Sequence, residues 1–286
     1  ITPIPTDVVY DAQKAALGKA LFFDPILSVD NTISCATCHN LPGSGADGLS
    51  FSFGVNGAEG SINAPSVLNS SLNFVQFWNG RAKSLAEQAL GPIVNPIEMA
   101  NRLDNVEKTL KSSAYKARFE AIYPDGVTIA NLADALAEFE KALLTPNSRF
   151  DRYLRGEEDA LNAQEIRGYE TFKSIGCISC HNGVNIGGNM YQKFGIFKEY
   201  KQKKESLGRY EITKRERDRY VFKVPSLRNV ALTPPYFHDG RVNTLAEAIF
   251  EMQEHQLGIV PKKEFTEDIE AFLNTLTGET PAIVRD

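Results

Sequence analysis

One short motif, Cys-x-x-Cys-His, occurs twice in this chain and uses all four of its cysteines. The copies are CATCH, residues 35–39, and CISCH, residues 177–181, and an asparagine follows each. Two thiols one helical turn apart can add across the two vinyl groups at one edge of a haem, and the next histidine is then held beside the iron. The motif therefore predicts two covalently attached haem c groups, with His39 and His181 as proximal ligands.

Other uses of paired cysteines fit this spacing poorly. A zinc ribbon needs its two pairs about 15–20 residues apart, whereas Cys35 and Cys177 are 142 residues apart. A redox-active dithiol belongs to a βαβ context, which the sequence lacks, and structural disulfides would leave both histidines unexplained. Haem c attachment implies an oxidising compartment outside the cytoplasm, so we expect a periplasmic protein.

The sixth coordination position of each iron decides whether a haem transfers electrons or binds a substrate. Met252 lies 71 residues after His181, on an expected helix over residues 245–255, which leaves enough chain to return to the far side of the second haem. A lone methionine on a helix more often packs in a core, but in a haem domain short of other ligands Met252 is the candidate. The remaining histidines and methionines are His238, His255, Met99 and Met190.

The first haem has no equivalent candidate. No histidine occurs between Asn40 and Cys180, and Met99 is the only methionine in that part of the chain. Glu98 precedes this methionine. A buried glutamate near an iron with an open position would suit acid–base chemistry on peroxide, whereas an ordinary surface glutamate is equally compatible with the spacing.

Composition and charge exclude several classes of protein. The chain has 286 residues, of which 42% are hydrophobic and 23% are charged, as in soluble globular proteins. Its net charge of −5 argues against nucleic acid as a partner. No run of 18 apolar residues occurs, so we expect no membrane span. The opening residues, ITPIPTDVVYD, lack the regions of a signal peptide, as in a processed form.

Helical patterns dominate the sequence, and we expect an all-α fold. The clearest amphipathic helix is opened by Thr128 and ended by Pro146, with Leu132, Leu136 and Phe139 on one face. Another is expected to end at Gly91-Pro92. A third is expected to end at Gly278. The other expected helix starts are Thr6-Asp7, Ser84, Asn162, Thr244 and Thr266.

The two motifs divide the chain into two similar halves. We expect two class I cytochrome c-like domains, each enclosing one haem c, over residues 1–147 and 148–286. The joint between them is expected within residues 145–159, TPNSRFDRYLRGEED.

Two irregular stretches separate the expected helices. Residues 41–62 hold six glycines, and an aperiodic loop of this length is usually functional or mobile. Residues 198–223 hold ten Lys and Arg against five Asp and Glu. This basic segment fits a solvated surface loop or hairpin, and a docking patch for an acidic partner is the alternative.

Longer stretches of the sequence carry a family resemblance over nearly its whole length. The chain resembles the bacterial di-haem cytochrome c peroxidases and, more distantly, their MauG-like relatives. The stretches that carry this resemblance are LGKALFFDPILS, SCATCHN, NAPSVLN, QFWNGRA, EQALGPIVNPIEMAN, GCISCHNG, FKVPSLRNVALTPPYFHDGR and TLAEAIFEMQEHQLG. Together they are far more specific than the Cys-x-x-Cys-His motif alone.

The resemblance implies a role for each haem. The first, on Cys35, Cys38 and His39, would be the peroxidatic centre. The second would be the high-potential electron-transfer centre, held by Cys177, Cys180 and His181, with Met252 as its sixth ligand.

The resemblance also assigns roles to other side chains. Glu98 would be the acid–base catalyst, Gln88 would help to line the distal pocket, and Trp78 would lie between the haems and couple them. A calcium ion would bind at the domain interface through the side chain of Asn63 and the backbone carbonyls of Thr233 and Pro235. Oxygen donors of this kind suit a hard cation.

One position departs from the pattern of many family members. They carry a histidine in the glycine-rich loop that ligates the peroxidatic iron in the resting oxidised enzyme and leaves on reduction of the other haem. The matching position here is Val55, followed by Asn56. Neither side chain ligates iron as an imidazole does, so we expect a first haem that is five-coordinate or water-bound when oxidised.

The resemblance implies a periplasmic peroxidase, probably none of whose chemistry involves nucleic acid or a membrane span, that reduces hydrogen peroxide to water with two electrons. A small cytochrome c or cupredoxin would supply the electrons, and a homodimer is expected. The first alternative is a MauG-like enzyme that oxidises protein residues; such enzymes have tyrosine where this chain has Met252, although their loop also lacks the histidine. The second alternative is a non-enzymatic di-haem electron carrier.

Overall fold

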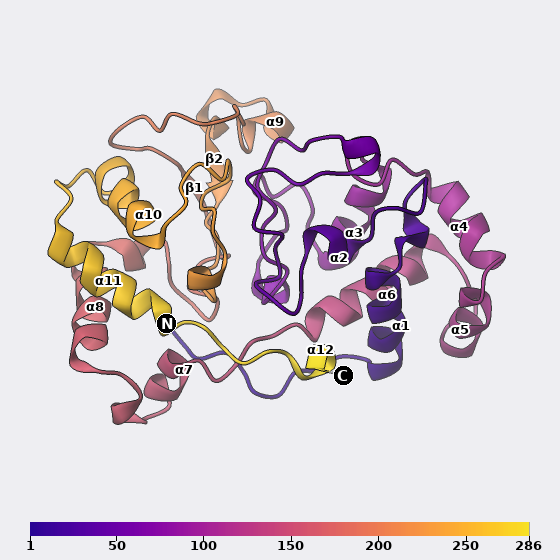
Figure 1. The fold of residues 1–286 in the computed structure, drawn as a ribbon, viewed down its shortest axis with the longest axis horizontal. Helices are drawn as coiled ribbons and strands as arrows, with labels where there is room; N and C mark the ends of the chain where they lie inside the picture. The colour runs from indigo at the N-terminus through magenta and orange to yellow at the C-terminus, as the bar shows by residue number, and fades with distance from the viewer. Residues whose placement is uncertain (286) are drawn as a thin grey trace.

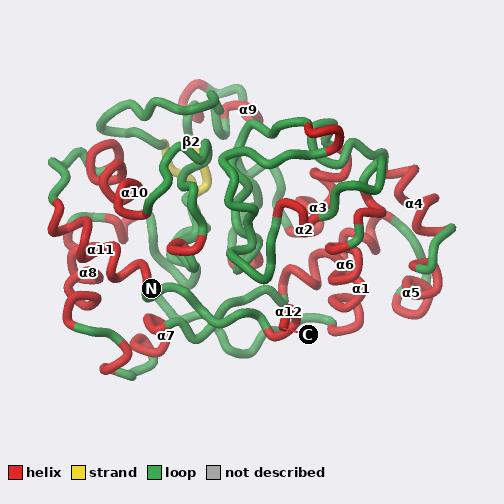
Figure 2. Tube along the Cα trace, in the orientation of Figure 1, coloured by secondary structure: helices red, strands yellow, loops and turns green. Residues whose placement is uncertain are grey.

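The computed structural model describes residues 1–285, which form two lobes side by side with their helices on the outside and loops on the facing surfaces (Figures 1 and 2). The first lobe holds α1 (Ala12–Phe23), α2 (Cys35–Cys38), α3 (Leu85–Val94), α4 (Leu103–Lys111), α5 (Tyr115–Ile122) and α6 (Ile129–Lys141). The second holds α7 (Arg149–Leu154), α8 (Ala163–Ser174), β1 (Tyr191–Lys193), α9 (Tyr210–Thr213), β2 (Val221–Lys223), α10 (Leu245–Glu251) and α11 (Lys263–Asn274).

Each lobe has its own hydrophobic core. Buried residues of the first core run from Leu17 to Leu143, and those of the second run from Phe150 to Leu276. The ends of the chain cross between the lobes, because Ile1 packs against the second core while the last helix, α12 (Ala282–Arg285), packs Ile283 against the first. In Figure 1 the N-terminus accordingly lies beside the second lobe and the C-terminus below the first.

The same helix crossing builds both cores. Helix α1 crosses α6 at Gly18, where an added Cβ would lie 2.0 Å from the carbonyl oxygen of Ala135. Helix α8 crosses α11 at Gly168, where an added Cβ would lie 1.9 Å from the carbonyl oxygen of Asp268. Only glycine allows the helices to approach this closely. The crossing packs Phe139 on Phe22 in the first lobe, and Phe272 on Phe172 in the second.

The expectation of an all-α chain is corrected by one small antiparallel sheet. Strands β1 and β2 pair Tyr191 with Lys223 and Lys193 with Val221. Strands of three residues are too short to show an alternating pattern in the sequence, which explains why they were not predicted. The sheet closes the base of an arm, residues 194–220, that contains most of the basic segment.

Expected helix starts at Ser84, Thr128, Asn162 and Thr244 are confirmed, since each side chain accepts a hydrogen bond from a backbone N–H in the first turn. Helix α1 begins at Ala12, not near Thr6, because the Asp11 carboxylate caps it. Helix α6 already ends at Lys141, before Pro146.

Two other expected boundaries are also wrong. Helix α3 continues through Pro92 to Val94, because the missing N–H of a proline costs only one bond near the end of a helix. Helix α11 begins at Lys263, and Thr266 lies inside it, where its hydroxyl donates to the Lys262 carbonyl.

The two lobes repeat one another at an interval of 160 residues. The sequence Pro-Ser-x-x-Asn occurs at 65–69 and at 225–229, and both asparagines are left-handed, with φ of 61° at Asn69 and 59° at Asn229. Antiparallel bridges join Gln76 to Ala82 and Tyr236 to Val242 at the same interval. The caps of α3 and α10, Ser84 and Thr244, are also 160 residues apart. The repeat therefore equates α3 with α10.

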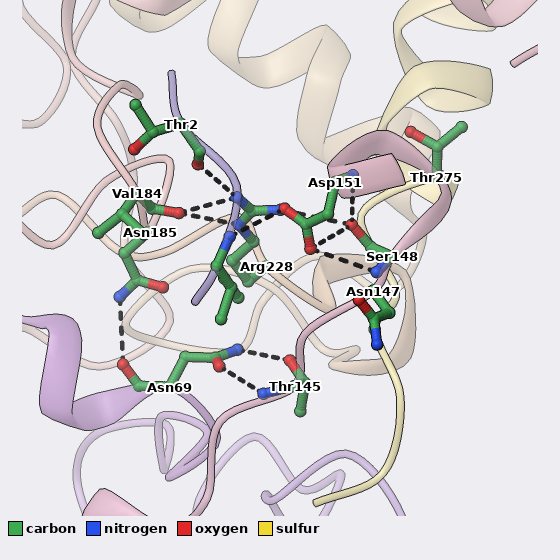
Figure 3. Close-up of polar contacts among 12 residues, drawn as sticks. Thr2, Asn69, Thr145, Asn147, Ser148, Asp151, Val184, Asn185, Arg228 and Thr275 are labelled. Carbon is green, nitrogen blue, oxygen red and sulfur yellow. Dashed lines mark hydrogen bonds and ion pairs between the residues drawn. The ribbon is translucent and has the colours of Figure 1, made fainter. Parts of the chain in front are cut away.

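A buried polar network joins the lobes to the N-terminal segment (Figure 3). Arg228 and Asp151 form an ion pair of 2.8 Å whose side chains are 1% and 0% exposed. The same guanidinium donates to the carbonyls of Thr2 and Val184, and the carboxylate accepts from the backbone N–H of Ile4. Nearby, the hydroxyl of Thr145 accepts from both repeated asparagines, Asn69 and Asn229.

Candidate functional site

The second Cys-x-x-Cys-His motif opens into a cavity that reaches the interface between the lobes. Cys177, Cys180, His181 and Met252 all line this cavity. Met252 begins a π-helical turn, Met252–Gln256, directly after α10. The structure therefore brings the four side chains together, although Met252 is 71 residues beyond the motif.

The orientation of His181 suits an iron ligand. Its Nδ1 lies 3.4 Å from the carbonyl oxygen of Ile186, which places the ring proton on Nδ1 and leaves the Nε2 lone pair free. Burial lowers the pKa of His181 to about 4, so the ring is neutral near pH 7. A neutral imidazole held by a carbonyl is the form that binds iron.

The first motif forms α2, which begins after Ser34, and it holds its histidine in the same way. Nδ1 of His39 lies 3.1 Å from the carbonyl oxygen of Gly45, in the glycine-rich loop. Gly45 has φ of 73°, and an added Cβ would lie 2.7 Å from the hydroxyl oxygen of Ser66, so the turn requires glycine. Burial lowers the pKa of His39 as well.

The cysteines are suited to attachment and unsuited to redox exchange. All four are free, although each pair is close in sequence. Burial raises the pKa of Cys35 to about 12, of Cys38 to about 11 and of Cys177 to about 12. A reactive dithiol needs a lowered pKa. These thiols lie beside histidines that are positioned for iron, and so the residues present fit two haems.

Glu98 is a half-buried carboxylate close to the first motif. Burial raises its pKa, while a 2.6 Å hydrogen bond from Asn95 Nδ2 and the charge of Arg81 oppose this rise. The charge of Glu98 in turn contributes to raising the pKa of Cys38, which shows that the two side chains are near one another. The turn that carries Glu98 folds back on α3, because Met99 donates to the Pro92 carbonyl.

The glycine-rich loop is fixed against Glu98. The backbone N–H of Val55 donates to the Glu98 carbonyl at 2.8 Å, and the Val55 side chain is buried. An added Cβ at Gly54 would lie 2.3 Å from the Ile97 carbonyl oxygen, so the contact needs a glycine there. The position at which relatives carry a histidine therefore adjoins the candidate acid–base residue.

The repeat shows which residue stands at the place of Met252 in the first lobe. Position 252 corresponds to Pro92, inside α3, and proline has no side-chain donor. Met99 is 2% exposed and belongs to the first hydrophobic core. Gln88 is half-buried on α3, one turn before Pro92.

Trp78 lies where the lobes meet and lines the cavity of the second motif. Its indole N–H donates to the Asn63 carbonyl at 2.9 Å, and its ring meets that of His238 edge to face at 6.1 Å. Two backbone bonds cross the interface in matching positions of the repeat: Asn63 donates to the His238 carbonyl, and Lys223 donates to the Trp78 carbonyl.

The three candidate calcium ligands also meet at this cavity. Asn63, Thr233 and Pro235 all line it. The amide nitrogen of Asn63 donates to the Leu49 carbonyl at 2.7 Å, which leaves its Oδ1 available. One amide oxygen and two backbone carbonyls fit a hard cation.

The basic arm folds over the glycine-rich loop. Lys204 forms an ion pair with Glu59, and Lys203 donates to the hydroxyl of Ser50 at 3.1 Å. The Arg209 guanidinium lies 3.9 Å from the centre of the Tyr191 ring. The segment is a surface arm, as one of the two interpretations predicted, and part of its charge is used within the molecule.

Fold and site together define a helical protein built to hold two haems, one in each repeated lobe. Comparison with known proteins identifies its relatives. A model of the di-haem cytochrome c peroxidase family matches residues 12–159. The chain is 50% identical to the cytochrome c551 peroxidase of Nitrosomonas europaea over 283 residues, which cover 98% of this chain and 85% of that protein.

Two further relatives agree. The cytochrome c peroxidase of Escherichia coli is 47% identical over 291 residues, which cover all of this chain but 63% of that protein. A solved structure of a MauG-like protein associated with microbial copper homeostasis superposes with a TM-score of 0.85 at 30% identity, covering 98% of this chain and 93% of that one. The chain belongs to the di-haem cytochrome c peroxidase family. No helix within residues 1–285 has the length and apolar character needed to cross a bilayer.

Sequence reasoning missed Lys223 and Arg81 as residues of the site. Lys223 lines the cavity of the second motif, and Arg81 faces Glu98 electrostatically. The 160-residue repeat would have drawn attention to both, because it equates Lys223 with Asn63 and Arg81 with Arg241.

Proposed function

We propose that this chain reduces hydrogen peroxide to water with two electrons from a small donor protein in the periplasm, a cytochrome c or a cupredoxin. The observation that carries the proposal is Glu98, a carboxylate with a raised pKa beside the first motif, in a lobe where Pro92 stands at the place of Met252. Family membership supports the peroxidase activity, since relatives that cover most of this chain are named cytochrome c peroxidases.

The proposed chemistry depends on the residues around the first site. Haem c, attached covalently through Cys35 and Cys38, would supply the iron that binds peroxide and accepts or donates electrons. His39 holds its Nε2 toward that iron, because its Nδ1 proton is engaged by Gly45. Glu98 takes a proton from one peroxide oxygen and returns it to the other, which favours cleavage of the bond between them. Gln88 helps to line this pocket.

The second site serves electron transfer in this proposal. Cys177 and Cys180 attach the second haem c, and His181 and Met252 hold its iron from opposite sides, which suits a high potential. Trp78 couples the sites from its position at the interface. The two lobes act as class I cytochrome c-like domains divided near residues 147 and 148. We further propose one calcium ion on Asn63, Thr233 and Pro235, and a homodimer.

The oxidised protein is expected to have a first haem that is five-coordinate or water-bound. Val55 offers no imidazole, and Pro92 offers no donor at all. Electron paramagnetic resonance of the oxidised protein should therefore show one high-spin and one low-spin haem. Two low-spin haems with strong ligands would contradict this expectation and would require a donor from elsewhere in the chain.

Replacing Met252 by histidine is expected to keep the second haem low-spin and to lower its reduction potential. Imidazole donates more strongly to ferric iron than a thioether does, so the oxidised state gains stability. A spectroelectrochemical titration measures the shift, and Met190→His, on the loop after the motif, is the matched control. A titration curve identical to that of the unaltered protein would show that Met252 is not the ligand.

Mixing the protein with reduced cytochrome c and peroxide tests the proposed function. A peroxidase oxidises many equivalents of cytochrome, whereas a di-haem electron carrier stops after stoichiometric exchange. The absence of a histidine at Val55 favours a second candidate, a MauG-like enzyme that oxidises protein residues. Met252 in place of a tyrosine argues against it, and failure of catalytic turnover with every small donor would support it.

A further inference from the structure

Lys223 is a buried cation that has no partner within the protein. It is 6% exposed at the end of β2. Burial lowers its pKa to about 8, and no neighbouring charge offsets that effect. Within residues 1–285 no carboxylate forms an ion pair with its ammonium group. A buried charge without a counter-charge is costly, so the ammonium group requires an anion from outside the protein.

The cavity beside Lys223 contains no protein anion that could serve. None of the residues that line it is Asp or Glu, although its wall includes Cys177, Cys180 and His181. Two other cations line it: Lys193, exposed on β1, and Arg228, whose guanidinium is paired with Asp151. Lys223 is therefore the buried cation of this wall that has no carboxylate partner among the described residues.

The backbone fixes the position of Lys223. Its N–H donates to the Trp78 carbonyl at 2.7 Å, and β-pairing holds it opposite Tyr191. The repeat equates Lys223 with Asn63, which forms the matching backbone bond across the interface. A residue tied to the other lobe in this way cannot move its ammonium group far from the cavity.

We propose that Lys223 binds a propionate carboxylate of the second haem and holds the potential of that haem high. This inference rests on the proposed function, which places a haem in the cavity. A haem carries two propionates, and these supply the anion that the cavity wall lacks. The charge of Lys223 offsets the carboxylate charge near the iron, so an added electron is favoured more than it would be beside an unpaired carboxylate.

Two neutral substitutions test the inference. Lys223→Gln keeps a polar side chain of similar reach, and Lys223→Met keeps the length without a polar group. Both are expected to lower the potential of the second haem in a spectroelectrochemical titration and to shift its propionate bending band in resonance Raman spectra. Lys201→Met, at an exposed position of the arm, removes the same charge far from solvent-excluded surroundings and should leave both readouts unchanged.

The outcomes separate this inference from the proposed function. Haem content and far-ultraviolet circular dichroism first establish that each variant is folded and loaded. A purified protein that carries no haem on the second motif would overturn the proposed function and the inference together. Two loaded haems with a potential and a propionate band in both Lys223 variants equal to those of Lys201→Met would overturn the inference alone.

Discussion

Glu98→Gln is expected to leave both haems attached and to lower peroxide turnover by about 10²–10⁴-fold, the usual contribution of a positioned acid–base group. The amide keeps the size of the side chain but cannot accept and return a proton. Steady-state oxidation of a reduced donor cytochrome measures the loss. Glu120→Gln, at an exposed position of α5 in the same lobe, is the matched control and should retain full activity.

The pH profile gives this prediction a second readout. Burial raises the pKa of Glu98, so the carboxylate form that accepts the proton is lost at a higher pH than for an ordinary glutamate. Activity should therefore fall on the acid side before pH reaches the usual glutamate range, and Glu98→Gln should lack that limb of the profile. Turnover of the variant within a few-fold of the unaltered protein would rule out the role of Glu98.

Asp151→Asn is expected to lower the free energy of unfolding by about 3–5 kcal/mol, because it leaves the Arg228 guanidinium buried without its counter-charge. Both side chains are almost completely shielded from water. Guanidinium chloride unfolding, followed by circular dichroism, measures the loss. Asp104→Asn breaks an exposed pair with Arg102 and should cost about 0–1 kcal/mol.

A double variant sharpens the test of this ion pair. Asp151→Asn with Arg228→Met removes both charges, so it should be less destabilised than Asp151→Asn alone. Equal losses in the single and double variants would mean that the damage comes from the hydrogen bonds of Asp151 to Ser148 and Ile4 and not from an unpaired charge.

The sequence was most informative where a local rule determines the structure. Ser84, Asn162 and Thr244 cap their helices as predicted, because a cap needs only a side-chain oxygen and the next turn. The Cys-x-x-Cys-His motif likewise carries its own geometry. The start of α1 was misplaced for the same reason, since Thr6 and Asp11 are both competent caps and only tertiary packing favours the later one.

The candidate site depended on contacts that a single sequence does not display. Met252 could be paired with His181 by chain length alone, but the bonds that tie Val55 to Glu98 and Lys223 to Trp78 join residues 43 and 145 positions apart. Neither partner has a distinctive pattern around it. The 160-residue repeat was detectable in principle, yet its two copies share few identical residues and became recognisable through matched φ angles at Asn69 and Asn229.

The crossing of the chain ends determines what the two lobes can do separately. A polypeptide divided at residue 147 would yield a first half whose opening residues, including Ile4, are held by Asp151 and Arg155 of the second. The second half would keep Ile283, which the first half binds through Lys19. Each half thus contains a piece of the other's surface. Gene duplication can account for two similar lobes, but the exchanged ends make them a single inheritable unit, and neither can be lost or replaced without leaving a gap in its neighbour.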